Sequence, residues 1–370
     1  MDAVFGFADE LGPLKVIHVH EPSVGLKGAL VVDNVARGPS IGGVRMAEDV
    51  STEECFRLAR AMTLKNAAAG LPHGGGKAVL YGDPRMPRER KELLIRALAC
   101  SLREVEQYIF APDMGTDEEC MGWVKDEIGR VVGLPRDLGG IPLDEIGATG
   151  WGLSHVVDVA LDYCDFGLEG ARLVVQGFGA VGKHAARFLT AQGAVLVGAA
   201  DSRGSVYNAK GLDLERLLEL KEAGKSVSAY TGAQSLERDA AVEMECDIWL
   251  PAARPDVVHE DNVARLKTRL VVQGANIPFT AGAERYLHDH GVLCVPDFIA
   301  NAGGVICAAM EYRGATEGAV MQSIEEKLRL NTRLVLEDAK ARRILPRQAA
   351  VELAVGRVRR AMSARRWSLF

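Results

Sequence analysis

The 370-residue chain has no apolar run long enough to span a bilayer and no excess of basic residues. Its net charge is −6, which gives no reason to expect a nucleic acid as partner. A transmembrane helix needs about 20 consecutive apolar residues, so we also expect no membrane insertion. These absences favour a cytoplasmic protein whose partner is a small molecule.

Cysteine is scarce, and the sequence contains no Cys-x-x-Cys pair. The scattered positions therefore favour reduced thiols in a reducing compartment over disulfides or a structural zinc site. His18 and His20 lie on one face of a predicted strand, but no carboxylate or cysteine stands beside them. Ordinary strand histidines are the better interpretation, and we expect no metal site. The seven cysteines stand at positions 55, 100, 120, 164, 246, 294 and 307.

The length and composition predict a globular protein of two domains. Apolar residues make up 48% of the chain and charged residues 25%, as in ordinary globular proteins. A chain of 370 residues is longer than a single domain with one hydrophobic core usually is. The stretch 133–147 is rich in glycine and proline and is the predicted junction. We place one domain at residues 1–138, the second at 139–322, and a helical tail at 323–370 that packs back on the first. The basic residues of this tail are interpreted as a solvated or subunit-facing surface.

Strands and helices alternate regularly in the second domain, which predicts a parallel, doubly wound sheet of the Rossmann kind. The first domain mixes strands with helices, two of which open on capping-box patterns, Ser51 with Glu54 and Thr116 with Glu119. The fold class is therefore α/β with two domains. In the second domain the predicted strands are 172–176, 195–200, 247–250, 270–273 and 292–295, and the predicted helices are 180–191, 212–222, 281–290 and 300–312.

A Gly-x-Gly-x-x-Gly motif directly follows the first of these strands and directly precedes a helix. Its residues are Gly177, Phe178, Gly179, Ala180, Val181 and Gly182. In this context the first glycine makes the tight turn, the second admits a pyrophosphate, and the third lets helix and strand pack closely. The motif therefore predicts a dinucleotide-binding site.

The choice of dinucleotide depends on Asp201, which ends the next apolar strand. A carboxylate there accepts a hydrogen bond from the ribose 2′-hydroxyl and repels a 2′-phosphate. Ser202 and Arg203 follow it, and an arginine at this place can pair with that phosphate. We predict NAD as the cofactor, with NADP as a possible alternative.

The first domain contains an unusual run of three glycines before a lysine, Gly74 to Gly76 and then Lys77, with Lys65 twelve residues upstream. Glycines leave the backbone bare and let a substrate approach closely. A buried lysine near another cation has its pKa lowered toward neutrality, which makes it a usable base. The pattern predicts a catalytic pair of lysines.

This glycine–lysine segment resembles the signature of the glutamate/leucine/phenylalanine/valine dehydrogenase family. The resemblance extends over nearly the whole chain and implies an N-terminal α/β domain for substrate binding and oligomerisation, followed by a Rossmann-like cofactor domain. Further matching motifs are Gly38-Pro-Ser-Ile41-Gly42-Gly43-Val-Arg45, Ala111-Pro-Asp113-Met-Gly-Thr116, Ala148-Thr149-Gly150, Gly274-Ala-Asn276 and Pro296-Asp-Phe-Ile-Ala-Asn301-Ala-Gly-Gly304.

The resemblance implies NAD-dependent oxidative deamination of an L-amino acid to a 2-oxo acid and ammonium. Lys77 would activate the attacking water, and Asp113 would move protons to and from the amino group. Lys65 and Asn276 would hold the substrate carboxylate, with Gly42 and Gly43 shaping the same pocket. Thr149, Ala252, Asn276 and Asn301 would join Ser202, Asp201 and the glycine motif in contacting the cofactor. The resemblance also implies a homo-oligomer.

For the side chain of the substrate the residues favour one class, and two alternatives stay open. Family members that act on glutamate carry a lysine where this chain has Ile41, and a small hydroxyl residue where it has Ala308. Together with Met62 and Val305, these residues predict an apolar pocket that favours leucine, valine or phenylalanine, because an unpaired buried carboxylate is costly. The alternatives are a glutamate dehydrogenase, which Arg45 or another cation could support, and a non-catalytic amino-acid-sensing subunit of one.

Overall fold

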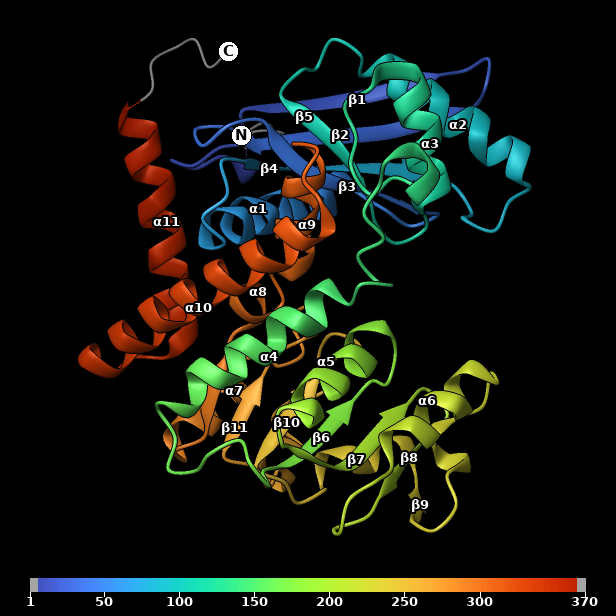
Figure 1. Cartoon of the computed structure of the whole chain (residues 1–370). Coiled ribbons are helices and arrows are strands. Elements are labelled where there is room, and N and C mark those ends of the chain that lie inside the picture. The colour runs from blue at the N-terminus through green and yellow to red at the C-terminus, as the bar shows by residue number, and fades with distance from the viewer. Residues whose placement is uncertain (1–5, 365–370) are drawn as a thin grey trace. The chain divides into compact units, whose positions relative to one another are not determined.

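The computed structural model describes residues 6–364 and divides the chain into two compact units (Figure 1). Among the described residues, unit 1 contains 6–142, 305–320 and 351–364, and unit 2 contains 143–304 and 321–350. The division between the units falls after Pro142, inside the predicted junction stretch 133–147, and described residues of the predicted tail belong to both units. Residues 365–370 of that tail lie outside the described part of the chain.

Unit 1 is built on a five-stranded sheet in the order β1-β2-β4-β3-β5. β1, β2 and β4 pair antiparallel, whereas β3 runs parallel to both β4 and β5. Its helices are α1 (Thr52–Ala68), α2 (Arg88–Ser101) and α3 (Glu118–Ile128). The strands are β1 (Lys15–Glu21), β2 (Leu26–Asn34), β3 (Ser40–Ala47), β4 (Gly74–Tyr81) and β5 (Tyr108–Pro112).

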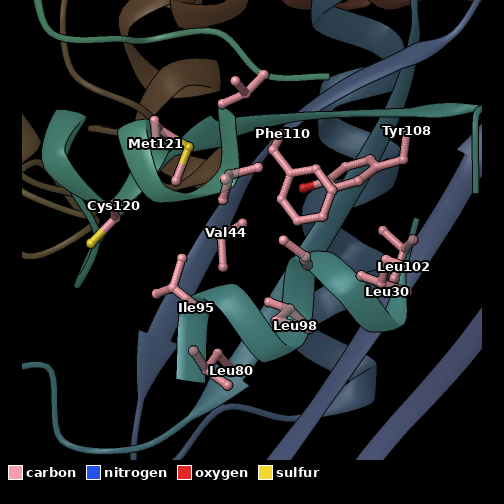
Figure 2. Packing of buried hydrophobic residues seen from close by; sticks show 14 of the residues in the cluster. Leu30, Val44, Leu80, Ile95, Leu98, Leu102, Tyr108, Phe110, Cys120 and Met121 are labelled. Carbon is pink, nitrogen blue, oxygen red and sulfur yellow. The ribbon is translucent and has the colours of Figure 1, made fainter. Parts of the chain in front are cut away.

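Alternate residues of β2 and β4 enter two separate cores, as the period of two in a strand requires. Leu30 and Leu80 pack with Leu98 of α2 on one face of the sheet (Figure 2). Val31 and Val79 pack with Ala59 of α1 on the other face. Because both faces are covered, the middle strands are mainly apolar, and the polar side chains that they bury need a specific partner.

Unit 2 contains a seven-stranded sheet in the order β12-β11-β10-β6-β7-β8-β9. β12 to β7 in this order run parallel, as predicted, but β8 and β9 extend the sheet antiparallel. The strands are β6 (Arg172–Gln176), β7 (Val195–Asp201), β8 (Gly204–Tyr207), β9 (Gln234–Leu236), β10 (Ile248–Pro251), β11 (Leu270–Val272) and β12 (Leu293–Val295). The helices are α4 (Ala148–Leu161), α5 (Ala180–Ala191), α6 (Leu214–Glu222), α7 (Ala281–Asp289) and α8 (Asp297–Ala300).

Three C-terminal helices contribute residues to both units: α9 (Gly303–Glu311), α10 (Glu317–Arg342) and α11 (Pro346–Ala364). The helix predicted over 300–312 corresponds to α9, while Ala300 belongs to the preceding short helix α8, whose C-cap residue is Asn301. Among residues 6–364, no helix combines the length and apolarity needed to cross a membrane.

One predicted helix start is confirmed and one is corrected. Ser51 caps α1 by accepting the Glu54 amide. The cap of α3 is Asp117 rather than Thr116, because the Thr116 hydroxyl already bonds the Val44 carbonyl and the Asp113 amide. That hydroxyl therefore ties the segment after β5 to β3 instead of opening the helix.

Candidate active site

The glycine run lies inside β4 rather than in a loop, and it brings α1 directly against that strand. A Cβ at Gly75 would lie 2.0 Å from the Thr63 amide nitrogen of α1. The buried Asn66 side chain crosses the same junction and donates to the Gly74 carbonyl at 2.7 Å. Lys65 is thus carried by a helix that packs without a gap on the strand that carries Lys77.

Lys77 and Asp113 form a mostly buried ion pair. The Lys77 ammonium lies 2.8 Å from Asp113 Oδ2, and 6% of the lysine side chain is exposed. Arg45 donates from Nε to the same oxygen at 2.9 Å and from a terminal nitrogen to Glu54 at 2.6 Å. No described residue donates to Asp113 Oδ1, and a quarter of this side chain is exposed. One carboxylate oxygen therefore stays available to a ligand.

The electrostatics of this cluster suit a neutral lysine base beside an ionised carboxylate. Burial lowers the pKa of Lys77 although Asp113 opposes the shift, and the charge of Arg45 lowers it further. Burial alone would raise the pKa of Asp113, but the charges and hydrogen bonds of Lys77 and Arg45 outweigh it and lower that pKa. Lys77 can thus lose its proton more easily than a solvated lysine, while Asp113 stays ionised.

The paired glycines Gly42 and Gly43 belong to β3, and a buried side chain of the neighbouring strand β5 contacts them. The fully buried Tyr108 donates its hydroxyl to the Gly42 carbonyl at 2.6 Å. A Cβ at Gly42 would lie 1.7 Å from the Gly76 carbonyl oxygen, and one at Gly43 would lie 2.6 Å from Asp113 Cβ. These glycines let β3 approach both the glycine run and the catalytic candidate Asp113.

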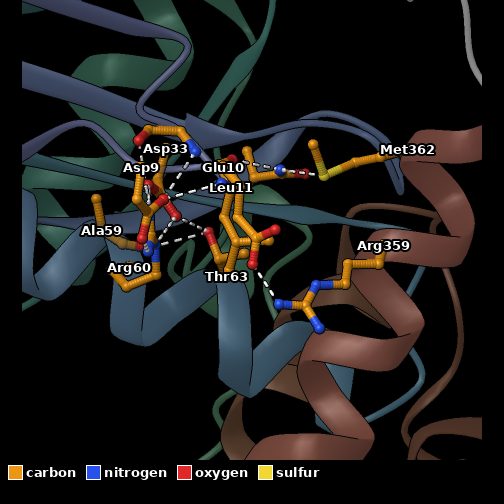
Figure 3. A network of polar contacts seen from close by, with 11 residues as sticks. Asp9, Glu10, Leu11, Asp33, Ala59, Arg60, Thr63, Arg359 and Met362 are labelled. Carbon is orange, nitrogen blue, oxygen red and sulfur yellow. Dashed lines mark hydrogen bonds and ion pairs between the residues drawn. The ribbon is translucent and has the colours of Figure 1, made fainter.

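A second buried ion pair fixes α1 close to Lys65 (Figure 3). The Asp33 side chain of β2 is fully buried and accepts from Arg60 at 2.9 Å and from the Thr63 hydroxyl at 2.6 Å. Arg60 also pairs with Asp9. At the end of the helix, Arg357 of α11 donates to the Ala67 and Ala68 carbonyls. This arginine of the tail therefore contacts a helix end instead of forming a solvated surface.

The four residues predicted to line the side-chain pocket all belong to unit 1. Ile41 is 3% exposed in β3, where it pairs with Gly75 and Ile109. Met62 of α1 is half-buried, as are Val305 and Ala308 of α9. Arg45 is engaged with Asp113 and Glu54 on the same sheet. The structure thus shows a buried apolar residue at position 41, while the shared pocket stays a prediction.

In unit 2 the glycine motif has the geometry that a dinucleotide requires. Gly177 has φ +104, and a Cβ there would lie 2.6 Å from the Ala253 nitrogen. A Cβ at Gly179 would meet open space, and no described side chain caps α5, which begins at the next residue. Gly182 packs on the Gly177 carbonyl. The first amides of α5 are thus open to an anion. Phe178 is buried, so it offers a ligand its backbone alone.

Asp201 lies at the end of β7, as predicted, but both oxygens of its carboxylate already accept hydrogen bonds from other residues of the chain. Oδ2 accepts from Lys221 at 2.7 Å and from the Val227 amide, and Oδ1 accepts from Ser226 and from the Arg203 amide. Burial would raise its pKa, but these donors lower it to about 2. A ribose hydroxyl could bind this carboxylate by replacing one of the four donors.

Two of the predicted site residues in unit 2, Asn276 and Asn301, lie together. Asn301 donates from its amide to the Asn276 side-chain oxygen at 2.9 Å and to the Gly274 carbonyl. Thr149, in the first turn of α4, packs beside Gly303 and Gly304. The Ala252 amide donates to Gln176 beside the glycine motif. Within residues 6–364, no group of three or more metal-binding side chains is found.

Comparison with known proteins supplies the family. Residues 13–130 match a model described as Glu/Leu/Phe/Val dehydrogenase, dimerisation domain, and residues 139–366 match one described as Glutamate/Leucine/Phenylalanine/Valine dehydrogenase. The chain belongs to this dehydrogenase family. It is an oxidoreductase that acts on the CH–NH₂ group of amino acids with NAD or NADP.

The similarity to known proteins extends over most of this chain and most of each relative. A glutamate dehydrogenase of Aeropyrum pernix is 38% identical over 90% of this chain and 85% of its own. An NADP(+)-dependent glutamate dehydrogenase of Pyrobaculum calidifontis is 36% identical over 92% and 87%. The leucine-bound form of a hetero-hexameric glutamate dehydrogenase from Thermus thermophilus has a TM-score of 0.85 at 29% identity, covering 96% of this chain and 91% of that one.

Sequence reasoning missed the contacts of several residues around the candidate site. Arg45 was visible in a motif, but its bond to Asp113 depends on the parallel pairing of β3 and β5. Tyr108 and Asn66 act on backbone carbonyls, which no side-chain pattern reveals. A capping or turn motif would have exposed such contacts, and neither residue lies in one.

Proposed function

We propose that Lys77 and Asp113 catalyse the reversible oxidative deamination of an L-amino acid to a 2-oxo acid and ammonium. The observation that carries this proposal is the buried Lys77–Asp113 pair in which Asp113 Oδ1 remains available. The cofactor, when bound, accepts the hydride from the substrate Cα. Asp113 takes a proton from the substrate ammonium, and neutral Lys77 takes a proton from the water that attacks the resulting imine carbon. Asp113 then returns its proton to the amino group, the C–N bond breaks as the carbonyl forms, and ammonium leaves.

Binding of the substrate carboxylate is assigned to Lys65 on unit 1, where Gly42 and Gly43 would shape the pocket, and to Asn276 on unit 2. A cation and an amide are suitable partners for a carboxylate, and charge-assisted hydrogen bonds are the stronger kind. On unit 2, the glycine motif, Thr149, Ala252 and Asn301 would hold the dinucleotide. Support comes from the open α5 amides and from the bond between Asn301 and Asn276.

We propose L-glutamate as the first substrate candidate. It is the alternative that the motifs leave open, and the relatives at 36–38% identity are named for it. The apolar amino acids remain a second candidate, because a buried isoleucine occupies position 41 and Arg45 is committed to Asp113 and Glu54. Neither Ile41 nor Ala308 can neutralise a second carboxylate.

Turnover with NAD and NADP on the twenty L-amino acids decides between the candidates. If glutamate is the substrate, its kcat/KM exceeds that of leucine, valine, phenylalanine and methionine. If the apolar set is preferred, Ile41→Lys should raise the glutamate value relative to the leucine value, with Ala308→Gly as the uncharged control. A chain that binds amino acids without turning over any of them would instead be the sensing subunit.

We propose that the enzyme works as a homo-oligomer, because the N-terminal family model is described as a dimerisation domain and a similar structure is hexameric. Light scattering on the purified chain tests this, and a monomeric mass at micromolar concentration would contradict it.

A further inference from the structure

The arginine at the start of α11 is engaged within unit 2 by three polar side chains. Arg347 donates from Nε to Glu284 at 2.5 Å and from a terminal nitrogen to Gln273 at 2.9 Å, and its other terminal nitrogen lies 2.9 Å from Asp297 Oδ1. Glu284, Gln273 and Asp297 are all buried. Three guanidinium nitrogens thus serve three separate partners, which no lysine could match.

The same network reaches the loop that carries Asn276. Asp297 uses its second oxygen, Oδ2, to accept the Ile277 amide at 2.8 Å. Asp297 begins α8, and Asn301, which ends that helix, donates to the Asn276 side chain. Residues at the two ends of the short helix α8, Asp297 and Asn301, therefore both bind the segment 274–277. Arg347 in turn pairs with Asp297.

Within this segment, the backbone of Ile277 adopts a left-handed conformation, which isoleucine disfavours. Ile277 has φ +49 and is 55% exposed. A β-branched residue in the left-handed region is a genuine outlier and persists where its surroundings impose it. Since the side chain is exposed, packing does not impose it. The constraint lies in the backbone contacts: the Ile277 amide on Asp297 and its carbonyl, which accepts from the Asp256 amide.

We propose that Arg347 is a positioning residue for substrate binding: it holds Asp297 on the Ile277 amide and thereby keeps Asn276 in place. Two buried carboxylates, Glu284 and Asp297, converge on this arginine, so its loss would leave both uncompensated and free Asp297 to turn away. The inference rests on the proposed function, because it takes Asn276 as a ligand of the amino acid.

A double-mutant cycle with Asn276→Ala tests the proposal. Arg347→Lys should raise the KM for the amino acid about 10-fold, with a smaller change in kcat and in the KM for the cofactor, because a misplaced binding group is felt mainly by the substrate. In the Asn276→Ala background the same substitution should change that KM less than about 2-fold, since coupled residues are not additive. Arg333→Lys, an exposed arginine of α10, is the matched control.

The outcomes separate the two proposals. If Asn276→Ala leaves the KM for the amino acid unchanged, the role of Asn276 in the proposed function is wrong, and the inference falls with it. If Asn276→Ala raises KM but Arg347→Lys does not, or if the two effects simply multiply, the positioning role is overturned while the proposed function stands. Should Arg347→Lys fail to fold, Asp297→Asn replaces it in the same cycle, with the same non-additive result expected.

Discussion

Two aspartates predicted from motifs, one in each unit, differ in how many of their carboxylate oxygens already accept hydrogen bonds from the chain. Asp113 receives Lys77 and Arg45 on a single oxygen and keeps the other available, with a quarter of its side chain exposed. Asp201 receives four donors on both oxygens, and 6% of its side chain is exposed. The first carboxylate can exchange protons with a ligand, whereas the second acts on a ligand mainly through its charge.

The difference shows that a motif can identify a functional residue but does not show how many hydrogen bonds that residue already accepts from the chain. A carboxylate accepts about four hydrogen bonds, and a site residue needs some of them unfilled. For Asp113 the neighbours are long cations that reach one oxygen from β3 and β4. For Asp201 the neighbours include backbone amides after the strand, which close around it. Four substitutions test this contrast, taken from the largest expected effect to the smallest.

Lys77→Ala should lower kcat by at least about 100-fold, because it removes the base that is proposed to activate water. Lys27→Ala, at an exposed lysine of the neighbouring strand β2, is the control and should leave kcat unchanged. Steady-state kinetics at saturating substrate measures both. A Lys77→Ala enzyme that keeps most of its turnover would remove Lys77 from the mechanism.

Lys65→Ala should raise the KM for the amino acid about 10- to 100-fold and change kcat less. A hydrogen bond to a charged group contributes about 1.5–3 kcal/mol, and a contact made equally in ground and transition states appears in KM. Initial rates against amino-acid concentration, at fixed cofactor, give the split. An unchanged KM with a collapsed kcat would instead place Lys65 in the chemistry.

Arg45→Gln should lower activity about 10-fold at neutral pH and move the acidic limb of the kcat/KM profile to higher pH. Arg45 lowers the pKa of Asp113 and that of Lys77, so its loss raises both. Both groups act in their deprotonated forms, and activity is lost as the pH falls through those pKa values. Arg88→Gln, an exposed pair partner of Glu119, controls for the loss of one charge. A limb that stays in place would show that Arg45 does not tune this pair.

The sequence predicted the fold class, the glycine motif and the identity of the catalytic candidates, because these depend on local periodicity and on residue type. It gave no sign that the glycine run is part of β4, since glycine carries no strand propensity and the close approach of α1 is a tertiary cause. It also assigned the basic residues of the tail, Arg347 and Arg357 among them, to a solvated or subunit-facing surface. Their partners, Asp297 and the end of α1, are remote in sequence, so no helical pattern could reveal them.

Asp201→Ala should reduce any preference for NAD over NADP several-fold, measured as the ratio of kcat/KM for the two cofactors. With a pKa of about 2 this carboxylate is charged at every working pH, so it repels a 2′-phosphate even though its oxygens are filled. Its removal also releases Lys221, which then adds a cation near the ribose. Glu219→Ala, an exposed carboxylate of α6, removes the same charge elsewhere and should leave the ratio unchanged. A ratio that Asp201→Ala does not move would mean that the filled carboxylate is purely structural, and that Ser202 or Arg203 sets the choice of cofactor.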